Sequence, residues 1–501
     1  MLTHCSDAVA YGLLLLSSFQ AASADAPLQV QTSSGSLTGF INCTAPSVRQ
    51  FLGVPFALPP TGKLRFEPPV KVTDNGPLQV KAFKPSCMQS VSGPVNTSDP
   101  NTDVYAIMPQ FGINGGISED CLYLNVYAPL NPTTPSLPVI VWPVPLFQIY
   151  GGGFTNGGAN VLYQIPDKWV QRTQGHVVVT MNYRLGVFGY PSAPGQMKNV
   201  GLMDQRMVVE WVRDNIAAFG GDPARISLMG QSAGSASVNF YAYSYVDDPI
   251  VAGFIGHSGA ASILTSTDAS GSNFNTLADS VGCGKLSAAA ELQCMQNVDA
   301  AKLQAAAESN RSRSFFPYAD NITAPANPAD RLAKGLVAKK PFLMGNTDNE
   351  GGGLSTIGGM TPEARRFGLS GLACPVIDEA NQRFQHGYVT YRYLYAGNFS
   401  NISPLPWIGA CHSCDLPLAF GTHYEYDNTH TGLKSTDLEW GTSFAMEGML
   451  KSPTQTGSVA AHCVDVNMQV SGSRSPPTRT KVRGIRITPG RNTTRTRQAL
   501  R

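Results

Sequence analysis

The feature that most constrains the fold is the pentapeptide Gly230-Gln-Ser-Ala-Gly234. An apolar stretch at residues 225–229 leads into it, and a small-residue stretch at residues 233–241 follows. A G-x-S-x-G motif between a strand and a helix is a nucleophile elbow, a strained turn that lifts the serine hydroxyl clear of the sheet. Glycine is needed on both sides because the turn leaves no room for side chains there. The pattern therefore predicts Ser232 as a catalytic nucleophile.

Apolar segments that alternate with helical segments predict the surrounding architecture. Helices are expected at residues 202–218 and within 274–307, and a proline-punctuated extended segment at 51–60. The compact strands are expected at residues 28–30, 37–40, 122–127, 139–142, 177–182, 342–345 and 388–395. This alternation predicts an α/β fold, with a large, mostly parallel central sheet flanked by helices and an antiparallel N-terminal edge. In such a sheet the active site lies at the carboxyl ends of the strands.

The N-terminal residues 1–24 have the features of a secretory signal peptide. An apolar core at residues 11–18 precedes Ala22-Ser-Ala24, which fits an A-x-A cleavage site, although no Lys or Arg precedes the core. A buried N-terminal helix is the alternative. The 10 cysteines favour an oxidising compartment with disulfides. Candidate N-glycosylation sequons support a secreted, extracellular protein, and they lie at Asn42, Asn96, Asn310, Asn321, Asn398, Asn401 and Asn492.

Charge is distributed unevenly along the chain. The formal net charge is +2, yet residues 472–501 contain arginines, one lysine and no acidic residue. Residues 458–501 are therefore expected to form a basic, disordered tail, with a polyanion-binding tail as the alternative. The body of the chain carries no basic pattern typical of nucleic-acid binding. The chain also contains no apolar run long enough for a transmembrane segment, and the sequence leaves the oligomeric state open.

Several separate motifs resemble the type-B carboxylesterase/lipase family of the α/β-hydrolase fold, in particular its secreted fungal members. The resemblance covers roughly residues 28–456, within an expected catalytic domain at 25–457. The motifs are Phe51-Leu-Gly-Val-Pro-Phe-Ala57, Leu64-Arg-Phe-Glu-Pro-Pro69, Ser118-Glu-Asp-Cys-Leu-Tyr-Leu-Asn-Val126, Tyr150-Gly-Gly-Gly-Phe154, Met181-Asn-Tyr-Arg-Leu185, the run from Phe219 to Gly234, Gly345-Asn-Thr-Asp-Asn-Glu-Gly351 and Gly409-Ala-Cys-His412. The resemblance implies a serine hydrolase that cleaves carboxylic esters through an acyl-serine intermediate. It implies a small-molecule or lipid ester as the substrate, and neither a metal nor an organic cofactor.

The family's triad follows the chain order serine, acid, histidine. By resemblance the acid is Glu350, with Asp348 as its nearest rival. Five histidines follow Glu350, and His412 alone matches the family's G-A-x-H position; the others are His386, His423, His430 and His462. A carboxylate beside the histidine would fix its tautomer and stabilise the imidazolium. The resemblance places the oxyanion hole at the backbone N–H groups of Gly152, Gly153 and Ala233.

The cysteines are assigned in part by the same resemblance. Cys87 with Cys121, and Cys283 with Cys294, match the family's two intrachain disulfides. The loop closed by the first pair carries apolar residues between 104 and 111, which either form a lid or pack into the core. Cys411 and Cys414 flank His412, but no second pair of ligands at suitable spacing supports a zinc site there.

Three departures from the family pattern bear on activity. Pro143-Val-Pro-Leu-Phe-Gln148 separates the expected strand from the glycine loop, and prolines do not fit the ladder of a central strand. The interval from Glu350 to His412 is shorter than usual, and the basic tail replaces the expected closing elements. The alternatives to an esterase are therefore a catalytically inactive binding or adhesion protein related to cholinesterases, or an inactive product. The sequence does not separate esterase from lipase.

Overall fold

The computed structural model describes residues 27–90, 98–108, 112–143, 153–266, 268–309, 315–427, 434–451, 464–468 and 488–489. The predicted signal peptide and three of the sequons (Asn96, Asn310 and Asn492) lie outside these residues. Gly152 and residues 144–148 of the insert lie outside them as well.

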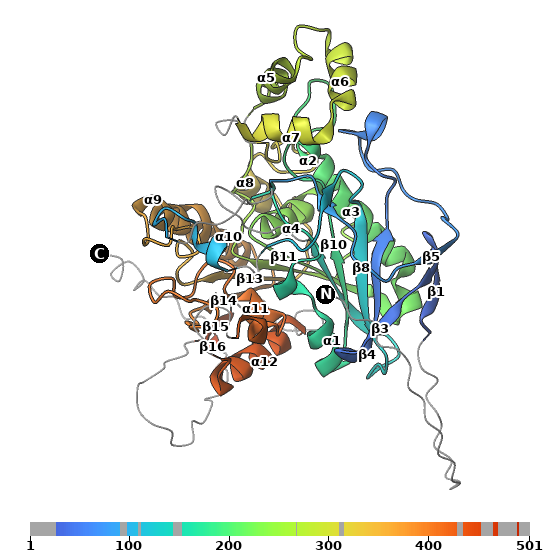
Figure 1. The fold of residues 1–501 in the computed structure, drawn as a ribbon. Coiled ribbons are helices and arrows are strands. Elements are labelled where there is room, and N and C mark those ends of the chain that lie inside the picture. Colours follow the sequence, from blue (N-terminus) through green and yellow to red (C-terminus); the bar gives the residue numbers. More distant parts are fainter. Residues whose placement is uncertain are drawn as a thin grey trace.

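A large mixed sheet forms the centre of the fold (Figure 1). In order across the sheet, its strands are β16 (Thr488–Pro489), β15 (Val464–Met468), β14 (Thr390–Tyr395), β13 (Phe342–Thr347), β12 (Gly253–His257), β11 (Gly221–Gln231), β9 (Leu137–Pro143), β10 (Val177–Met181), β8 (Tyr123–Pro129), β4 (Ala45–Pro55) and β3 (Phe40–Asn42). The strands from β15 to β10 pair in parallel, whereas β8, β4 and β3 pair antiparallel. The predicted fold class, a mostly parallel sheet with an antiparallel N-terminal edge, is confirmed.

Two small sheets accompany the central one. The first has the order β1 (Gln29–Thr32), β2 (Gly35–Thr38) and β5 (Pro77–Gln79), and the second pairs β6 (Ser86–Cys87) with β7 (Ile117–Ser118). The second sheet brings the two ends of the Cys87–Cys121 loop together, because Cys87 pairs with Ser118.

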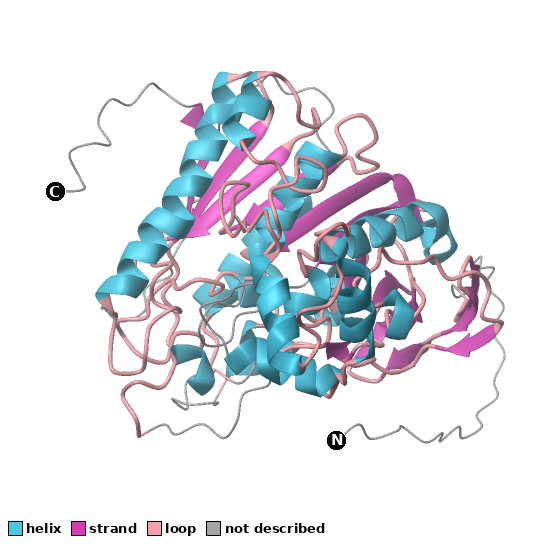
Figure 2. Ribbon diagram, turned by 90° about the horizontal axis from the view of Figure 1, so that it is seen from above, coloured by secondary structure: helices cyan, strands magenta, loops and turns pink. Residues whose placement is uncertain are grey.

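Helices cover both faces of the central sheet, as Figures 1 and 2 show. The α-helices are α1 (Asp167–Thr173), α2 (Gly186–Gly189), α3 (Val200–Asn215), α4 (Ala233–Ser244), α5 (Ser272–Val281), α6 (Ala288–Asn297), α7 (Ala300–Ser309), α8 (Pro328–Ala333), α9 (Pro362–Phe367), α10 (Cys374–Gln385), α11 (Leu416–Ala419) and α12 (Asp437–Lys451). A π-helical turn, η6 (Gly368–Ala373), joins α9 to α10. The short 3₁₀ segments are η1 (Gly62–Leu64), η2 (Val104–Ile107), η4 (Leu162–Gln164), η5 (Ile216–Phe219) and η7 (His423–Tyr426).

The two-residue repeat of the strands divides the core into two layers. Val139 and Val141 of β9 pack in one buried cluster, together with apolar residues of α3, α4, α8 and α10. Ile140 and Trp142 belong to a second cluster, which contains residues of α1, α11 and α12. Successive side chains of a strand point to opposite faces, so an unbroken apolar run such as that of β9 is buried by helices on both sides.

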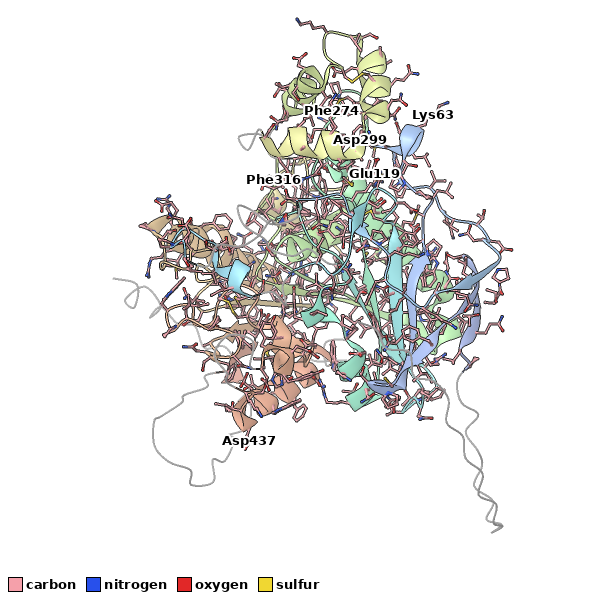
Figure 3. All side chains as sticks on the ribbon, viewed as in Figure 1. Lys63, Glu119, Phe274, Asp299, Phe316 and Asp437 are labelled. Carbon is pink, nitrogen blue, oxygen red and sulfur yellow. A yellow bond between two sulfur atoms is a disulfide. The ribbon has the colours of Figure 1, made fainter. Side chains whose placement is uncertain are left out.

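A separate small cluster lies at one end of the molecule. Helices α5, α6 and α7 extend beyond the sheet (Figure 1, top), and Phe274 and Asp299 mark this region in Figure 3. Phe274, Met295 and Leu303 are buried there, and the Cys283–Cys294 disulfide joins α6 to the residues after α5. This region has a core of its own, distinct from the two layers around the sheet.

Three strands in the C-terminal part of the chain were not predicted from the sequence. Strand β12 was not predicted, although it lies between β11 and β13. Residues 464–468 and 488–489 form β15 and β16, so the expectation of a disordered tail is wrong for these two segments; the rest of 458–501 lies outside the described residues. The alternation Val464-Asp-Val-Asn-Met468 is a strand pattern that the surrounding basic composition obscured.

Pro143 also corrects the sequence analysis. It is the last residue of β9, opposite Met181 of β10, although the sequence analysis placed it outside the ladder. A proline at the end of a strand is tolerated because its missing N–H interrupts no hydrogen bond farther along.

No helix in the described part of the chain combines the length and apolar character that crossing a membrane requires.

Candidate active site

Ser232 lies at the turn between β11 and α4, as the pentapeptide predicts. Its φ of 54° and ψ of −120° are unusual for a residue other than glycine, which is the backbone strain of a nucleophile elbow. A Cβ atom on Gly230 would lie 2.3 Å from the carbonyl oxygen of Gly234, so a side chain there would collide with the backbone. The N–H of Ser232 donates to the carbonyl of His257 at 2.8 Å, which ties the turn to the end of β12.

Glu350 and His412 meet although they are 62 residues apart. Glu350 follows β13, and His412 lies in the loop between β14 and α11. Nδ1 of His412 is 2.5 Å from Oε2 of Glu350, and both side chains are buried. Asp348, the rival acid, is exposed, and its N–H donates to the carbonyl of Tyr395. The structure therefore pairs Glu350, and not Asp348, with His412.

The second oxygen of Glu350 is held by two donors. The hydroxyl of Ser258 donates to Oε1 at 2.7 Å, and the backbone N–H of Thr347 donates to the same atom at 2.8 Å. Ser258 has a φ of 56° and comes directly after β12, next to the elbow. Since Oε1 is occupied in this way, Oε2 is turned towards the imidazole.

The other ring nitrogen of His412, Nε2, faces the residue that precedes the nucleophile. Nε2 of His412 lies 2.9 Å from Nε2 of Gln231, the residue before Ser232. With the imidazole proton on Nδ1, shared with Glu350, Nε2 accepts the hydrogen bond from the Gln231 amide. The hydroxyl of Ser232 is buried and has no hydrogen-bond partner among the described residues. His412 and Glu350 thus lie together, and His412 contacts Gln231, the neighbour of Ser232 at the carboxyl end of β11.

The other histidines that follow Glu350 in the chain lie elsewhere. His386 is exposed at the end of α10, and His423 is buried in η7 with Nδ1 at 2.8 Å from the hydroxyl of Ser435. Burial lowers the pKa of His423 to about 4. His430 and His462 lie outside the described residues.

The predicted oxyanion-hole residues are partly described. Ala233 is the first residue of α4, where the helix N-terminus favours negative charge. Gly153 packs against the side chain of Leu264, whose Cδ1 atom would be 2.8 Å from a Cβ on Gly153. A side chain at position 153 would therefore have to displace Leu264 or the glycine loop. Gly152 lies outside the described residues.

The two predicted disulfides, Cys87–Cys121 and Cys283–Cys294, are confirmed. The structure adds a third, between Cys411 and Cys414, which the sequence analysis missed. Its sulfurs are therefore not free to bind zinc, and the part of the chain that the structure describes holds no cluster of three or more metal-ligating side chains.

The loop closed by Cys87 and Cys121 packs against the body of the protein. Val104 and Met108 are buried in the second core cluster, and the N–H of Val104 donates to the carbonyl of Ser355 at 3.1 Å. These two residues therefore take the packing alternative that the sequence left open. Ile107 is partly buried and packs against the same cluster, whereas the side chains of Tyr105 and Phe111 lie outside the described residues.

Among the asparagines of the described sequons, only Asn401 has a buried side chain. Its side chain is 4% exposed, and its amide donates to the carbonyl of His423 and to Asp427, each at 3.3 Å. A glycan on this nitrogen would break both contacts, so the burial of Asn401 argues against glycosylation there. The tripeptide motif carries no information on burial. Asn42 is partly exposed, and Asn321 and Asn398 are exposed.

Three residues of the site carry no motif of their own. Gln231 and Ser258 contact His412 and Glu350 directly, and Asp415 accepts a hydrogen bond from the hydroxyl of Tyr393 at 2.8 Å. Their common signal is position, because each lies within three residues of a predicted site residue or directly after a strand of the sheet.

Comparison with known proteins identifies the family to which this chain belongs. The sequence model of the carboxylesterase family matches residues 26–366, more than half of the chain. The chain belongs to the carboxylesterase family. It is a carboxylic ester hydrolase with the α/β-hydrolase fold, as its relatives below also indicate.

The relatives include two fungal enzymes. The chain is 51% identical to a chlorogenic acid esterase of Aspergillus niger over 433 residues, which cover 84% of this chain and 81% of that protein. It is 39% identical to secreted lipase 5 of Gibberella zeae, with 81% of this chain and 82% of that protein covered. A solved structure of a thermophilic PNB esterase superposes with a TM-score of 0.71 at 25% identity, covering 88% of this chain and 96% of that chain. These comparisons confirm the resemblance to type-B carboxylesterases and lipases.

Proposed function

We propose that this carboxylesterase is a secreted serine hydrolase that cleaves its ester through an acyl-Ser232 intermediate. The observation that carries the proposal is the 2.5 Å contact between Nδ1 of His412 and Oε2 of Glu350, beside the strained elbow that holds Ser232. A serine, a base within reach and a carboxylate that orients the base are the groups that acyl transfer requires.

In the first half-reaction, Oγ of Ser232 attacks the ester carbonyl carbon and its proton passes to Nε2 of His412. Glu350 stabilises the imidazolium that forms. The N–H groups of Ala233, Gly153 and Gly152 donate to the oxyanion of the tetrahedral intermediate. The bond to the alcohol oxygen then breaks, and the alcohol takes the proton from Nε2. Water repeats the sequence on the acyl-enzyme, releasing the acid and restoring Ser232.

For this cycle Gln231 has to give up its contact with Nε2 of His412, because that lone pair must receive the Ser232 proton. We infer that the side chain of Gln231 rotates away from Nε2 during the cycle. The arrangement described is therefore the resting state of the proposed site.

The substrate we propose is chlorogenic acid or an ester like it, supported by the 51% identity to the chlorogenic acid esterase. A lipid ester is the second candidate, because the lipase relative is 39% identical over a similar share of the chain. Secretion is supported by the signal-like residues 1–24 and by disulfide bonds, which persist in oxidising compartments.

The test is hydrolysis by the purified full-length protein of three substrates, namely chlorogenic acid, p-nitrophenyl butyrate and emulsified tributyrin. We expect the protein to hydrolyse chlorogenic acid and p-nitrophenyl butyrate. Its kcat/KM should be higher for chlorogenic acid than for tributyrin. Ser232→Ala should lower kcat by about 10⁴-fold or more while the protein stays folded. Activity that survives Ser232→Ala would overturn the acyl-serine mechanism, and a preference for tributyrin would favour the lipase. A folded wild type that hydrolyses none of them would favour an inactive binding protein.

A further inference from the structure

His412 lies inside a ring of four residues that a disulfide closes. Cys411 and Cys414 are joined through their sulfurs, and only His412 and Ser413 lie between them. Both cysteines are buried, at 0% and 1% exposure. No other described disulfide touches the candidate active site, since Cys87–Cys121 and Cys283–Cys294 join segments before β8 and beside α6.

The backbone inside the ring is in a conformation that needs support. Ser413 has a φ of 69°, in the left-handed region that residues other than glycine rarely adopt. The N–H of Cys414 donates to the carbonyl of Cys411 at 3.0 Å, which closes a turn around His412 and Ser413. A covalent link between the two ends of the turn removes the open conformations that would relieve Ser413.

The ring is attached to the rest of the site on both sides. Before it, the carbonyl of Ala410 accepts the N–H of Asn349 at 2.9 Å, so the ring is tied to the residue next to Glu350. After it, Oδ2 of Asp415 accepts the hydroxyl of Tyr393 at 2.8 Å, and both side chains are buried. The ends of the segment are therefore fixed, and the disulfide sets the course of the backbone between them.

We propose that the Cys411–Cys414 disulfide positions His412, and that the oxidised bond is needed for full turnover. The proposal rests on the proposed function, because it assigns a task to the base of the triad. Without the link, Ser413 can leave the left-handed region, and the imidazole of His412 then shifts away from Ser232. A misplacement of about 1 Å at a reacting group lowers the rate by about 10²-fold, so the effect belongs in kcat.

The proposal also makes turnover sensitive to reduction. A dithiol such as dithiothreitol supplies two electrons and two protons, which convert the disulfide to two thiols, and the dithiol closes to its own cyclic disulfide. Because both sulfurs are buried, the reaction requires opening of the ring segment and is slow in the native protein. Removal of the dithiol and air oxidation should restore both the bond and the activity.

The test compares two double variants of the full-length protein, each of which lacks one disulfide. Cys411→Ala with Cys414→Ala removes the proposed positioning bond, and Cys283→Ala with Cys294→Ala removes a disulfide of the peripheral α5–α7 cluster as the matched control. For p-nitrophenyl butyrate we expect kcat to fall by about 10- to 100-fold in the first variant, with KM within about twofold of wild type. The control should keep kcat within about twofold at whatever thermal stability it retains. Wild type and Ser232→Ala are measured alongside.

Each outcome decides the matter. If Ser232→Ala abolishes wild-type activity and the Cys411/Cys414 variant keeps kcat within about twofold, the positioning proposal is wrong and the acyl-serine mechanism stands. If Ser232→Ala retains activity, the proposed function itself fails. If the Cys411/Cys414 variant does not fold, native wild type is reduced, its free thiols are mapped by alkylation, and activity is followed. Full activity with Cys411 and Cys414 alkylated overturns the proposal; reversible loss that tracks these two thiols supports it.

Discussion

The side-chain amide of Gln231 occupies the proton-accepting face of His412, with 2.9 Å between their Nε2 atoms. Nδ1 of His412 faces Glu350, so the neutral imidazole has a single lone pair, at Nε2. The N–H of Gln231 and the hydroxyl of the neighbouring Ser232 therefore compete for one acceptor. This competition distinguishes a resting arrangement from the reactive one.

Replacing Gln231 by Met keeps the length of the side chain and removes its N–H. A neutral hydrogen bond contributes about 1 kcal/mol, so freeing Nε2 should raise kcat/KM by up to about fivefold. The measurement is kcat/KM for p-nitrophenyl butyrate at pH 7. A lower value in Gln231→Met would show that the amide helps to hold His412 in place and does not block it.

Ser258 tests how firmly the carboxylate must be held. Ser258→Ala removes one of the two donors to Oε1 of Glu350 and leaves the N–H of Thr347. We expect kcat to fall by about three- to tenfold with little change in KM, because the lost bond is worth about 1 kcal/mol and acts on the acid. Ser235→Ala is the matched control, since its buried hydroxyl donates to the carbonyl of Gly259 at 2.8 Å and touches neither Glu350 nor His412. Equal effects in both variants would contradict a specific role for Ser258.

Gly153 and Leu264 form a pair that can be tested as a cycle. A methyl group on Gly153 would meet Cδ1 of Leu264 at 2.8 Å, so Gly153→Ala must displace either that side chain or the glycine loop. If the loop moves, the proposed oxyanion donor of Gly153 moves with it, and kcat should fall by about 10-fold or more. Leu264→Ala removes the obstacle, so the double variant should recover most of the loss. A double variant as slow as Gly153→Ala would exclude this clash as the cause.

Some parts of this site are predictable because their signal is local. The elbow around Ser232 is such a case: glycines at fixed offsets, an apolar strand before and a small-residue helix after are all adjacent in the chain. Glu350 and His412 needed the family resemblance, because nothing in their immediate neighbours shows that they meet. The mostly parallel sheet followed from the alternation of strands and helices.

The parts that the sequence did not reveal depend on contacts made by the fold. Ser258 follows β12, a strand of five residues with glycine at two positions, which has no strong strand pattern. Cys411 and Cys414 carry no information on whether they pair with each other or bind a metal until the loop conformation is known. Asn401 matches a sequon, and only tertiary packing against His423 shows that its amide is buried.

His423 makes the free energy of unfolding depend on pH. The imidazole is buried in η7 and its ring contacts that of Trp440. Burial lowers the pKa of His423 from 6.5 to about 4, even though Asp427 acts in the opposite direction. Because the folded state disfavours the proton, the unfolded chain binds more protons between these two pH values. Stability from the neutral imidazole is therefore complete above about pH 6.5 and is lost as the pH falls towards 4.

His423→Asn keeps a polar group near the hydroxyl of Ser435 and removes the titration. The lowered pKa corresponds to about 3 kcal/mol in full, of which about 2 kcal/mol is lost by pH 5. Wild type should therefore lose about 2 kcal/mol more unfolding free energy than His423→Asn between pH 7.5 and pH 5. The measurement is urea unfolding of both proteins at the two pH values, which cancels the titration of groups they share. Parallel losses in the two proteins would mean that His423 does not stay neutral in the folded state at pH 5.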